Sequence, residues 1–159
     1  MPDERKPTAP GVVRKATELD APQIARLYAM LVSNSAVRVL PERLAEIASD
    51  PDTALFVFED GEAVLGTVMV SLCADVMFGR RPFAVVENIV VDQAARGLRI
   101  GERLLQAVES FCTGADCSKI MLLSAASREH AHTFFERCGY SGSTKRGFVK
   151  YRTAFGARD

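Results

Sequence analysis

The sequence predicts an α/β fold with one central, mixed but mostly antiparallel sheet of six to seven strands, flanked by about four helices. Three observations support this fold. Apolar runs of strand length alternate with segments whose apolar residues recur at helical spacing. A short Asp-Gly turn between two strand candidates predicts an antiparallel hairpin. Strand–helix–strand units elsewhere require some parallel pairing.

The length of the chain, 159 residues, suits one domain. We expect this domain to span residues 11–159, because no internal linker interrupts it. The polar, proline-rich start of the chain predicts a disordered lead-in over residues 1–10.

The first third of the chain holds a strand followed by two helices. The strand is expected over residues 12–17. Asp20 predicts the start of a helix that runs to about Val32, and Pro22 suits the first turn of that helix. Apolar residues at helical spacing predict a second, short helix over 41–49.

The middle of the chain is rich in strands. Two apolar runs over 54–58 and 63–72 predict the hairpin. A loop over 76–82 leads to the most apolar strand candidate, residues 83–91, which is interrupted only by Glu87-Asn88.

The last third alternates helices and strands. A helix is expected over 100–112, a strand over 119–124, and a further helix from about Ser127 to Arg137. Residues 140–153 predict a final hairpin, which brings the sheet to its six or seven strands.

The composition argues against several classes of function. Twenty acidic residues balance twenty Lys and Arg, so no overall field favours nucleic acid. No apolar run is long enough to span a membrane, and the start of the chain lacks the apolar core of a signal peptide, so we expect a cytoplasmic protein. The four cysteines form no Cys-x-x-Cys pair, and no metal site is expected.

The turn after the strand over 83–91 has the features of an anion-binding site. The first backbone N–H groups of the next helix lack partners within that helix and lie at the positive end of its dipole. Glycines in the turn let the backbone approach an anion, and arginines add positive charge. By spacing alone, a plain strand–turn–helix with exposed arginines explains the segment equally well. The residues concerned are Arg96, Gly97, Arg99, Gly101 and Arg103.

Residues 88–105 strongly resemble the coenzyme-A motif of the GNAT N-acetyltransferases, Gln/Arg-x-x-Gly-x-Gly/Ala after a strand that ends in valine. The motif falls on Arg96, Arg99 and Gly101, so that an arginine replaces the middle glycine.

Two further segments agree with this family. Residues 13–21 resemble its opening strand and helix start, and residues 131–140 resemble its late motif, Ala-x-x-Phe-Tyr-Glu-x-x-Gly-Phe. The resemblance covers about residues 12–153, and it implies a GNAT acetyltransferase domain.

The resemblance implies that acetyl-CoA, as co-substrate, binds in an opening between the strands over 83–91 and 119–124. Backbone groups of the first strand would pair with the pantetheine arm, and the amides of the following turn would hold the pyrophosphate. The implied contacts are Ile89, Val90, Val91, Arg96, Gly97, Leu98, Arg99, Ile100, Gly101, Glu102 and Phe135.

Two proton transfers accompany such a reaction. Glu87 is the candidate base, because it interrupts an apolar strand beside the cofactor, where we expect it to be buried; a structural or substrate-binding carboxylate explains it equally well. Phe135 stands where relatives carry the tyrosine that protonates the leaving thiolate. Tyr140 is a substitute acid, although we favour a packed tyrosine. Asn88 orients substrate or, as we favour, pairs with the backbone.

The predicted function is transfer of an acetyl group from acetyl-CoA to a primary amine, with a small metabolite favoured as acceptor. One alternative is an acyl-CoA-binding regulatory module without turnover, suggested by Phe135 and Arg99. Another is a structural protein that uses the fold for dimerisation. The expected partners are acetyl-CoA and an amine, with no nucleic acid and no membrane, and a homodimer is compatible with this fold.

Overall fold

The computed structural model describes residues 8–156 and divides the chain into two compact units, which meet in sequence at Leu122 and Leu123. In the described part of the chain, no helix is long and apolar enough to cross a membrane.

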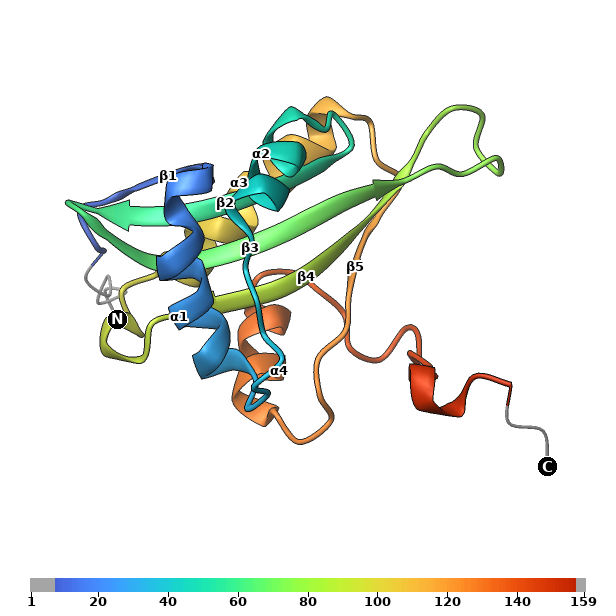
Figure 1. Cartoon of the computed structure of the whole chain (residues 1–159). Coiled ribbons are helices and arrows are strands. Elements are labelled where there is room, and N and C mark those ends of the chain that lie inside the picture. The colour runs from blue at the N-terminus through green and yellow to red at the C-terminus, as the bar shows by residue number, and fades with distance from the viewer. Residues whose placement is uncertain (1–7, 157–159) are drawn as a thin grey trace, which may run out of the picture. The chain divides into compact units, whose positions relative to one another are not determined.

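The first unit is built on a five-stranded sheet in the order β1-β2-β3-β4-β5 (Figure 1). The first three pairings are antiparallel and the last, between β4 and β5, is parallel. Apolar side chains of the central strands, among them Val68 and Val70, are fully buried and form the core. The strands are β1 Val12–Lys15, β2 Thr53–Asp60, β3 Ala63–Cys73, β4 Phe83–Val91 and β5 Ile120–Leu122.

Helices cover both faces of this sheet (Figure 1). One face carries α1 and α2, whose buried Ile24, Leu27 and Leu44 join a core cluster with β2. The other face carries α3, which lies so close to β3 that a Cβ atom on Gly66 would come within 3.0 Å of Ile100. The helices are α1 Ala21–Leu31, α2 Pro41–Ser49 and α3 Ile100–Gly114.

Most predicted elements are confirmed. The bounds of α2 and β4 are as expected, and α3 runs two residues beyond the predicted Cys112. The mixed α/β class is confirmed, whereas β5 is shorter than the predicted 119–124. In the lead-in, Ala9 is buried and its N–H donates to the carbonyl of Leu98, so this end of the segment packs on the domain; residues 1–7 lie outside the described residues.

The second unit contains the helix α4 (Glu129–Arg137) and a single 3₁₀ turn, Arg152–Ala154. Within its described residues, 123–156, no strand forms, so the predicted final hairpin is wrong and the sheet has fewer strands than expected. Residues 141–150 are exposed along their whole length. An isolated two-stranded hairpin without a covered apolar face is marginal in water, which accounts for the difference.

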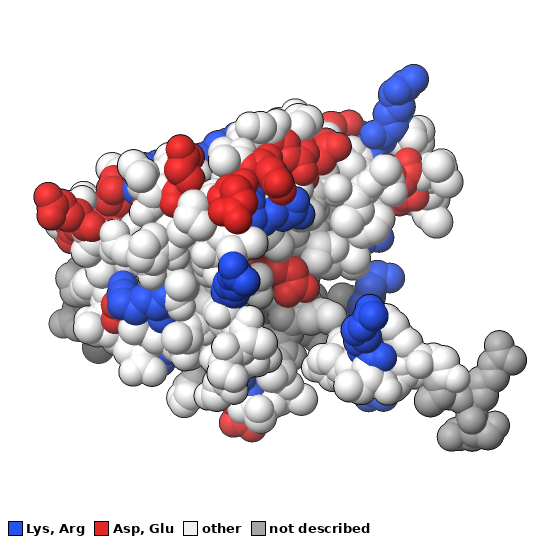
Figure 2. All heavy atoms as spheres, in the orientation of Figure 1, with Lys and Arg blue, Asp and Glu red and all other residues white. Residues whose placement is uncertain are grey.

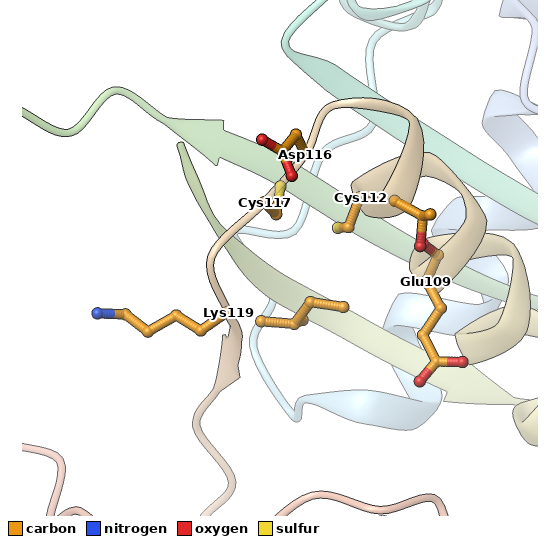
Figure 3. A pocket seen from close by; sticks show the side chains of 7 residues that line it. Glu109, Cys112, Asp116, Cys117 and Lys119 are labelled. Carbon is orange, nitrogen blue, oxygen red and sulfur yellow. The ribbon is translucent and has the colours of Figure 1, made fainter. Parts of the chain in front are cut away.

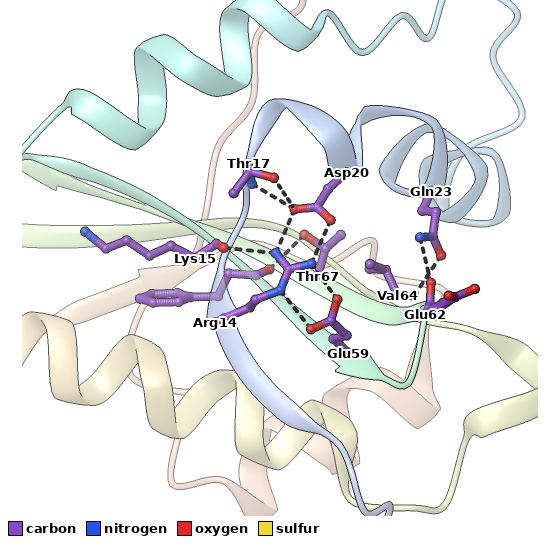
Figure 4. A network of polar contacts seen from close by, with 10 residues as sticks. Arg14, Lys15, Thr17, Asp20, Gln23, Glu59, Glu62, Val64 and Thr67 are labelled. Carbon is purple, nitrogen blue, oxygen red and sulfur yellow. Dashed lines mark hydrogen bonds and ion pairs between the residues drawn. The ribbon is translucent and has the colours of Figure 1, made fainter.

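An arginine-centred network joins β1 to β2 and to the start of α1 (Figure 4). The Arg14 guanidinium donates two hydrogen bonds of 2.8 Å to Asp20, and further bonds of 2.8 and 3.1 Å to Glu59. Asp20 also accepts the Thr17 N–H at 2.8 Å. Asp20 was predicted to cap α1, but its side chain accepts no capping bond from that helix because it faces Arg14 and Thr17 instead. Hydrogen bonds from Arg14 lower the pKa of both carboxyl groups.

Candidate active site

One edge of β4 is left open along half its length. Pairing with β5 ends at Val86, opposite Leu122. Beyond that point, no strand of the described chain pairs with this edge, although β3 still pairs with Val90 and Val91 on the other edge. Backbone donors and acceptors of the open edge are therefore available to an extended ligand, in the manner of an added strand.

A β-bulge interrupts β4 at the start of this open edge. Met69 of β3 faces Glu87, whereas Thr67 faces Val90, so Val68 stands opposite two residues instead of one. Asn88, one of the two, has a φ of +55°, in the left-handed region that asparagine tolerates better than most residues. The extra residue brings Glu87 and Val90 to the same face of the sheet, since partners across a ladder share a face.

That face is the one covered by α1 and α2. Met69 packs against the core cluster on this side, and Glu87 is its partner across the strands. The Glu87 side chain is nevertheless exposed, so the prediction that it is buried is wrong. The physical reason is local: β5 stops before reaching it, and Asn88 next to it is exposed as well.

Tyr28 of α1 reaches the bulge, a contact that the sequence did not reveal. Burial raises the pKa of the phenol, and the nearby Asn88 side chain opposes this rise in part. Tyr28 follows Ile24 by one helical turn, so the only sequence signal was its place on the apolar stripe, where a packing role is the ordinary expectation.

The turn after β4 is fixed to both neighbouring layers. The Asp92 carboxylate accepts a 3.0 Å hydrogen bond from the Ala94 N–H and a 2.6 Å ion pair from Arg26 of α1. Arg26 also donates to the carbonyl of Val64 in β3. The hydrogen bond from Arg26 lowers the pKa of Asp92, which therefore stays ionised and keeps the turn in place at neutral pH.

The approach to α3 is made by two residues with left-handed backbone. Gly97 has a φ of +83° and Arg99, immediately before the helix, a φ of +61°. Arg99 therefore adopts the conformation that favours glycine, the residue for which it substitutes in the motif. Its guanidinium donates to Glu102 at 2.7 Å, within the first turn of α3.

The three arginines predicted around the turn have different roles. Arg103 donates to the carbonyls of Ala9 and Gly11 and lies 4.8 Å from the ring centre of Phe58, so it anchors the start of the chain. Arg99 is paired with Glu102, which leaves Arg96 as the exposed guanidinium with no ion-pair partner among the described residues. Together with the first amides of α3, Arg96 supplies the positive character expected of a phosphate site.

Two predicted site residues, Phe135 and Tyr140, belong to the second unit. Phe135 is buried, and its ring centre lies 5.3 Å from that of Phe134 and 6.2 Å from that of Tyr140. Tyr140 follows α4, and its N–H donates to the carbonyl of Phe135. The ring of Tyr140 is thus part of an aromatic cluster, but it does not lie in a strand as the sequence had suggested.

A surface pocket of about 480 Å³ lies elsewhere, between the end of α3 and the start of β5 (Figure 3). Its lining includes Cys112 and Cys117. Burial raises the pKa of Cys112 to about 12 and also raises that of Cys117. Because the thiolate is the reactive form of cysteine, these side chains are poor nucleophiles at neutral pH.

Comparison with solved structures supports the fold. A candidate acetyltransferase from Agrobacterium tumefaciens is similar, with a TM-score of 0.80 and 26% identity over 89% of this chain and 99% of that chain. Glucosamine-6-phosphate N-acetyltransferase from Arabidopsis thaliana gives 0.79 and 22% identity over 89% of this chain and 98% of that chain. A transcriptional regulator from Bacillus halodurans gives 0.77 and 25% identity over 89% of this chain and 99% of that chain.

No curated protein sequence matches this chain. A family model does, however: that of the acetyltransferase (GNAT) family matches residues 22–140, which include the open strand edge, the left-handed turn and α3. The chain therefore belongs to the GNAT family of acetyltransferases.

Proposed function

We propose that this protein transfers an acetyl group from acetyl-CoA to a primary amine by direct attack. The observation that carries this proposal is the open edge of β4, which runs from Glu87 to Val91 and continues into the turn and first amides of α3. The edge suits an extended amide-bearing chain, and the helix start suits phosphate; acetyl-CoA carries both groups in one molecule.

The residues present fit acetyl-CoA, which supplies the activated thioester. Backbone groups of Ile89 to Val91 would pair with the pantetheine amides. The amides from Arg96 to Gly101 would hold the pyrophosphate, with the exposed Arg96 guanidinium as counter-charge.

The acceptor amine must lose a proton before it attacks, since an alkylammonium has a pKa of about 10. Glu87 takes this proton, directly or through water, and its exposure leaves room for either route. The nitrogen lone pair then bonds to the carbonyl carbon, the carbon–sulfur bond breaks, and coenzyme A leaves as a thiolate. The second proton of the attacking nitrogen passes to water or to this thiolate, which leaves a neutral amide. Phe135 lacks a hydroxyl, but a thiol pKa of about 8.5 makes the thiolate a tolerable leaving group without a dedicated acid.

The cofactor site is tested by placing a carboxylate in it. Gly101→Glu, in the first turn of α3, should abolish the rise in melting temperature that acetyl-CoA produces, because a ligand that binds only the folded state stabilises it. Gly114→Glu is the matched control, since Gly114 is exposed at the far end of α3 with no atom within 4 Å of the added Cβ. Equal thermal shifts in wild type and Gly101→Glu would refute the site.

Turnover is tested by release of free thiol from acetyl-CoA across a panel of primary amines. We expect release with at least one amine and none without acceptor. Acetyl-CoA binding without release for any amine would instead favour the regulatory module.

A further inference from the structure

The turn before α3 makes few backbone hydrogen bonds of its own. Over residues 97–102, no backbone amide donates to an acceptor among the described residues. The turn is held from outside instead, because the Ala9 N–H donates a 3.2 Å hydrogen bond to the Leu98 carbonyl. Ala9 is only 4% exposed, so water has little access to this donor. A segment that lies before the first strand therefore holds the turn in place.

This hydrogen bond orients an amide as well as a carbonyl. The Leu98 carbonyl and the Arg99 N–H belong to one planar trans peptide unit, in which the two groups point in opposite directions. Since the carbonyl points toward Ala9, the Arg99 N–H points away from Ala9. That N–H is one of the amides that we propose to hold the pyrophosphate. Ala9 thus directs a phosphate donor without contacting the phosphate itself.

Arg103 of α3 keeps Ala9 in this position. Its guanidinium presents several N–H donors in one plane, and it donates at 3.0 Å to the Ala9 carbonyl and at 2.7 Å to the Gly11 carbonyl. A Cβ atom on Gly11 would overlap the carbonyl of Glu59, so the segment lies directly against β2. Arg103 therefore acts on the turn through residues 9–11.

Surface charge gives little help in holding phosphates. The formal net charge of the chain is zero. On the face that Figure 2 shows, the Lys and Arg side chains are scattered among acidic and uncharged ones and form no continuous basic patch. Because a long-range field from such a surface is weak, affinity for the phosphates depends on amides that are already oriented before the ligand binds.

We propose that Arg103 and Ala9 are positioning residues for the pyrophosphate of acetyl-CoA: Arg103 holds Ala9, and the Ala9 N–H sets the direction of the Arg99 amide. This inference rests on the proposed acetyl transfer. It assigns part of the cofactor affinity to residues that do not contact the cofactor, and it limits their effect to donors that carry phosphate. S-acetylpantetheine, a thioester donor without phosphate, should therefore be insensitive to both residues.

The hydrogen bond to the turn is tested by Ala9→Pro, which removes the N–H and keeps the carbonyl. We expect the Kd for acetyl-CoA, measured by calorimetry, to rise by about threefold to tenfold, the usual effect of one neutral hydrogen bond. The kcat/KM for S-acetylpantetheine should stay at the wild-type value. Thr8→Pro places the same ring at an exposed residue whose N–H donates to no described acceptor, and it should leave both quantities unchanged.

The role of Arg103 is tested by Arg103→Met, which keeps an apolar stem and removes the donors to both carbonyls. The Kd for acetyl-CoA should rise as in Ala9→Pro. The double variant should bind no worse than the weaker of the two single variants, because both changes act on one hydrogen bond. Arg43→Met removes an exposed guanidinium from α2 and serves as the control.

The inference would be overturned by an unchanged Kd in both single variants, even if their melting temperatures fall, because these residues would then have a structural role alone. An equal loss with S-acetylpantetheine would overturn it as well. In either case, acetyl-CoA binding that Gly101→Glu abolishes would leave the proposed function standing. Absence of acetyl-CoA binding by the wild-type protein would overturn both.

Discussion

At the scale of single residues, left-handed backbone marks both ends of the candidate site. Asn88 adopts this conformation at the bulge, and Arg99 adopts it immediately before α3. For a residue other than glycine this conformation costs roughly 1–2 kcal/mol, with asparagine at the low end. Such strain persists where the surrounding structure fixes it, and it concentrates at binding and catalytic sites. The bulge and the turn thus depend on their neighbours more than on the preferences of these two residues.

Replacing Arg99 tests this dependence. Arg99→Gly should keep the free energy of unfolding within about 0.5 kcal/mol of wild type, because relief of strain offsets the entropy gained by the unfolded chain and the loss of an exposed ion pair. Arg99→Val should lower it by about 1–2 kcal/mol, since a branched side chain tolerates a positive φ poorly. Urea unfolding followed by circular dichroism measures both. Equal stability of the two variants would show that the turn adopts another conformation in solution.

Glu87 gives a second prediction at this scale. Glu87→Gln should slow amine turnover by about 10²- to 10⁴-fold, the range for loss of a general base, with little change in the Kd for acetyl-CoA. Glu109→Gln, an exposed change on α3, serves as the control. A Glu87→Gln variant that matches wild type at every pH would remove Glu87 from the base role.

At the scale of elements, the Arg14 network explains how a strand of four residues stays attached to the sheet. Arg14 projects from β1 to Asp20 before α1 and to Glu59 in β2, so one guanidinium joins β1, the start of α1 and β2 (Figure 4). The Asp20 side chain is only 6% exposed, which limits competition by water. The attachment of β1 to β2 and to the start of α1 is therefore strengthened by these ion pairs.

The network predicts a pH dependence of stability. The pKa of Asp20 is lowered in the folded protein, so its contribution is present above the unfolded value of about 4 and is lost as the pH falls through the folded value. Asp20→Asn should lower the free energy of unfolding by about 2 kcal/mol at pH 7, and the difference from wild type should shrink below about pH 4. Thermal unfolding from pH 3 to 8 measures this, with exposed Asp52→Asn as control. A difference that stays constant with pH would contradict the ionic explanation.

Elements with strong local patterns were predictable from the sequence. The continuous apolar run of β4 and the helical spacing in α2 are local properties, and both elements have the predicted bounds. The bulge at Asn88 was not predictable, because it is a register shift between two strands. The approach of Tyr28 to Asn88 was missed for a related reason: the two residues are sixty positions apart, and only the packing of α1 on the sheet brings them near each other.

At the scale of the whole molecule, the two units differ in how their backbones are bonded. The first contains a continuous five-stranded sheet whose neighbouring strands are joined by backbone hydrogen bonds. In the second, no amide from Ser141 to Tyr151 donates to a carbonyl of the described backbone. Aromatic packing around Phe135 holds this unit together near α4. Stability is therefore unevenly distributed along the chain.

Hydrogen exchange measured by mass spectrometry should reveal this difference. Without ligand, amides over 141–151 should exchange orders of magnitude faster than those of β3, whose central side chains are fully buried. The exposed residues 78–80 provide an internal reference for unprotected amides, whereas the amides of Val76 and Met77 donate to the Asp75 carboxylate. Protection of 141–151 close to that of β3 would mean that the hairpin expected from the sequence forms in solution.

The hydrogen bonds that Ala9 and Gly11 make with the turn before α3, and with α3 itself, have a practical consequence. Ala9 bonds to Leu98 in the turn, and Arg103 of α3 holds the carbonyls of both Ala9 and Gly11. A truncated protein that begins at β1 would keep every strand of the sheet. It would lose the hydrogen bonds of Ala9 and Gly11, which stabilise the turn that we propose to bind phosphate. A recombinant version of the protein should therefore begin before Ala9, and an affinity tag should be attached N-terminal to that residue.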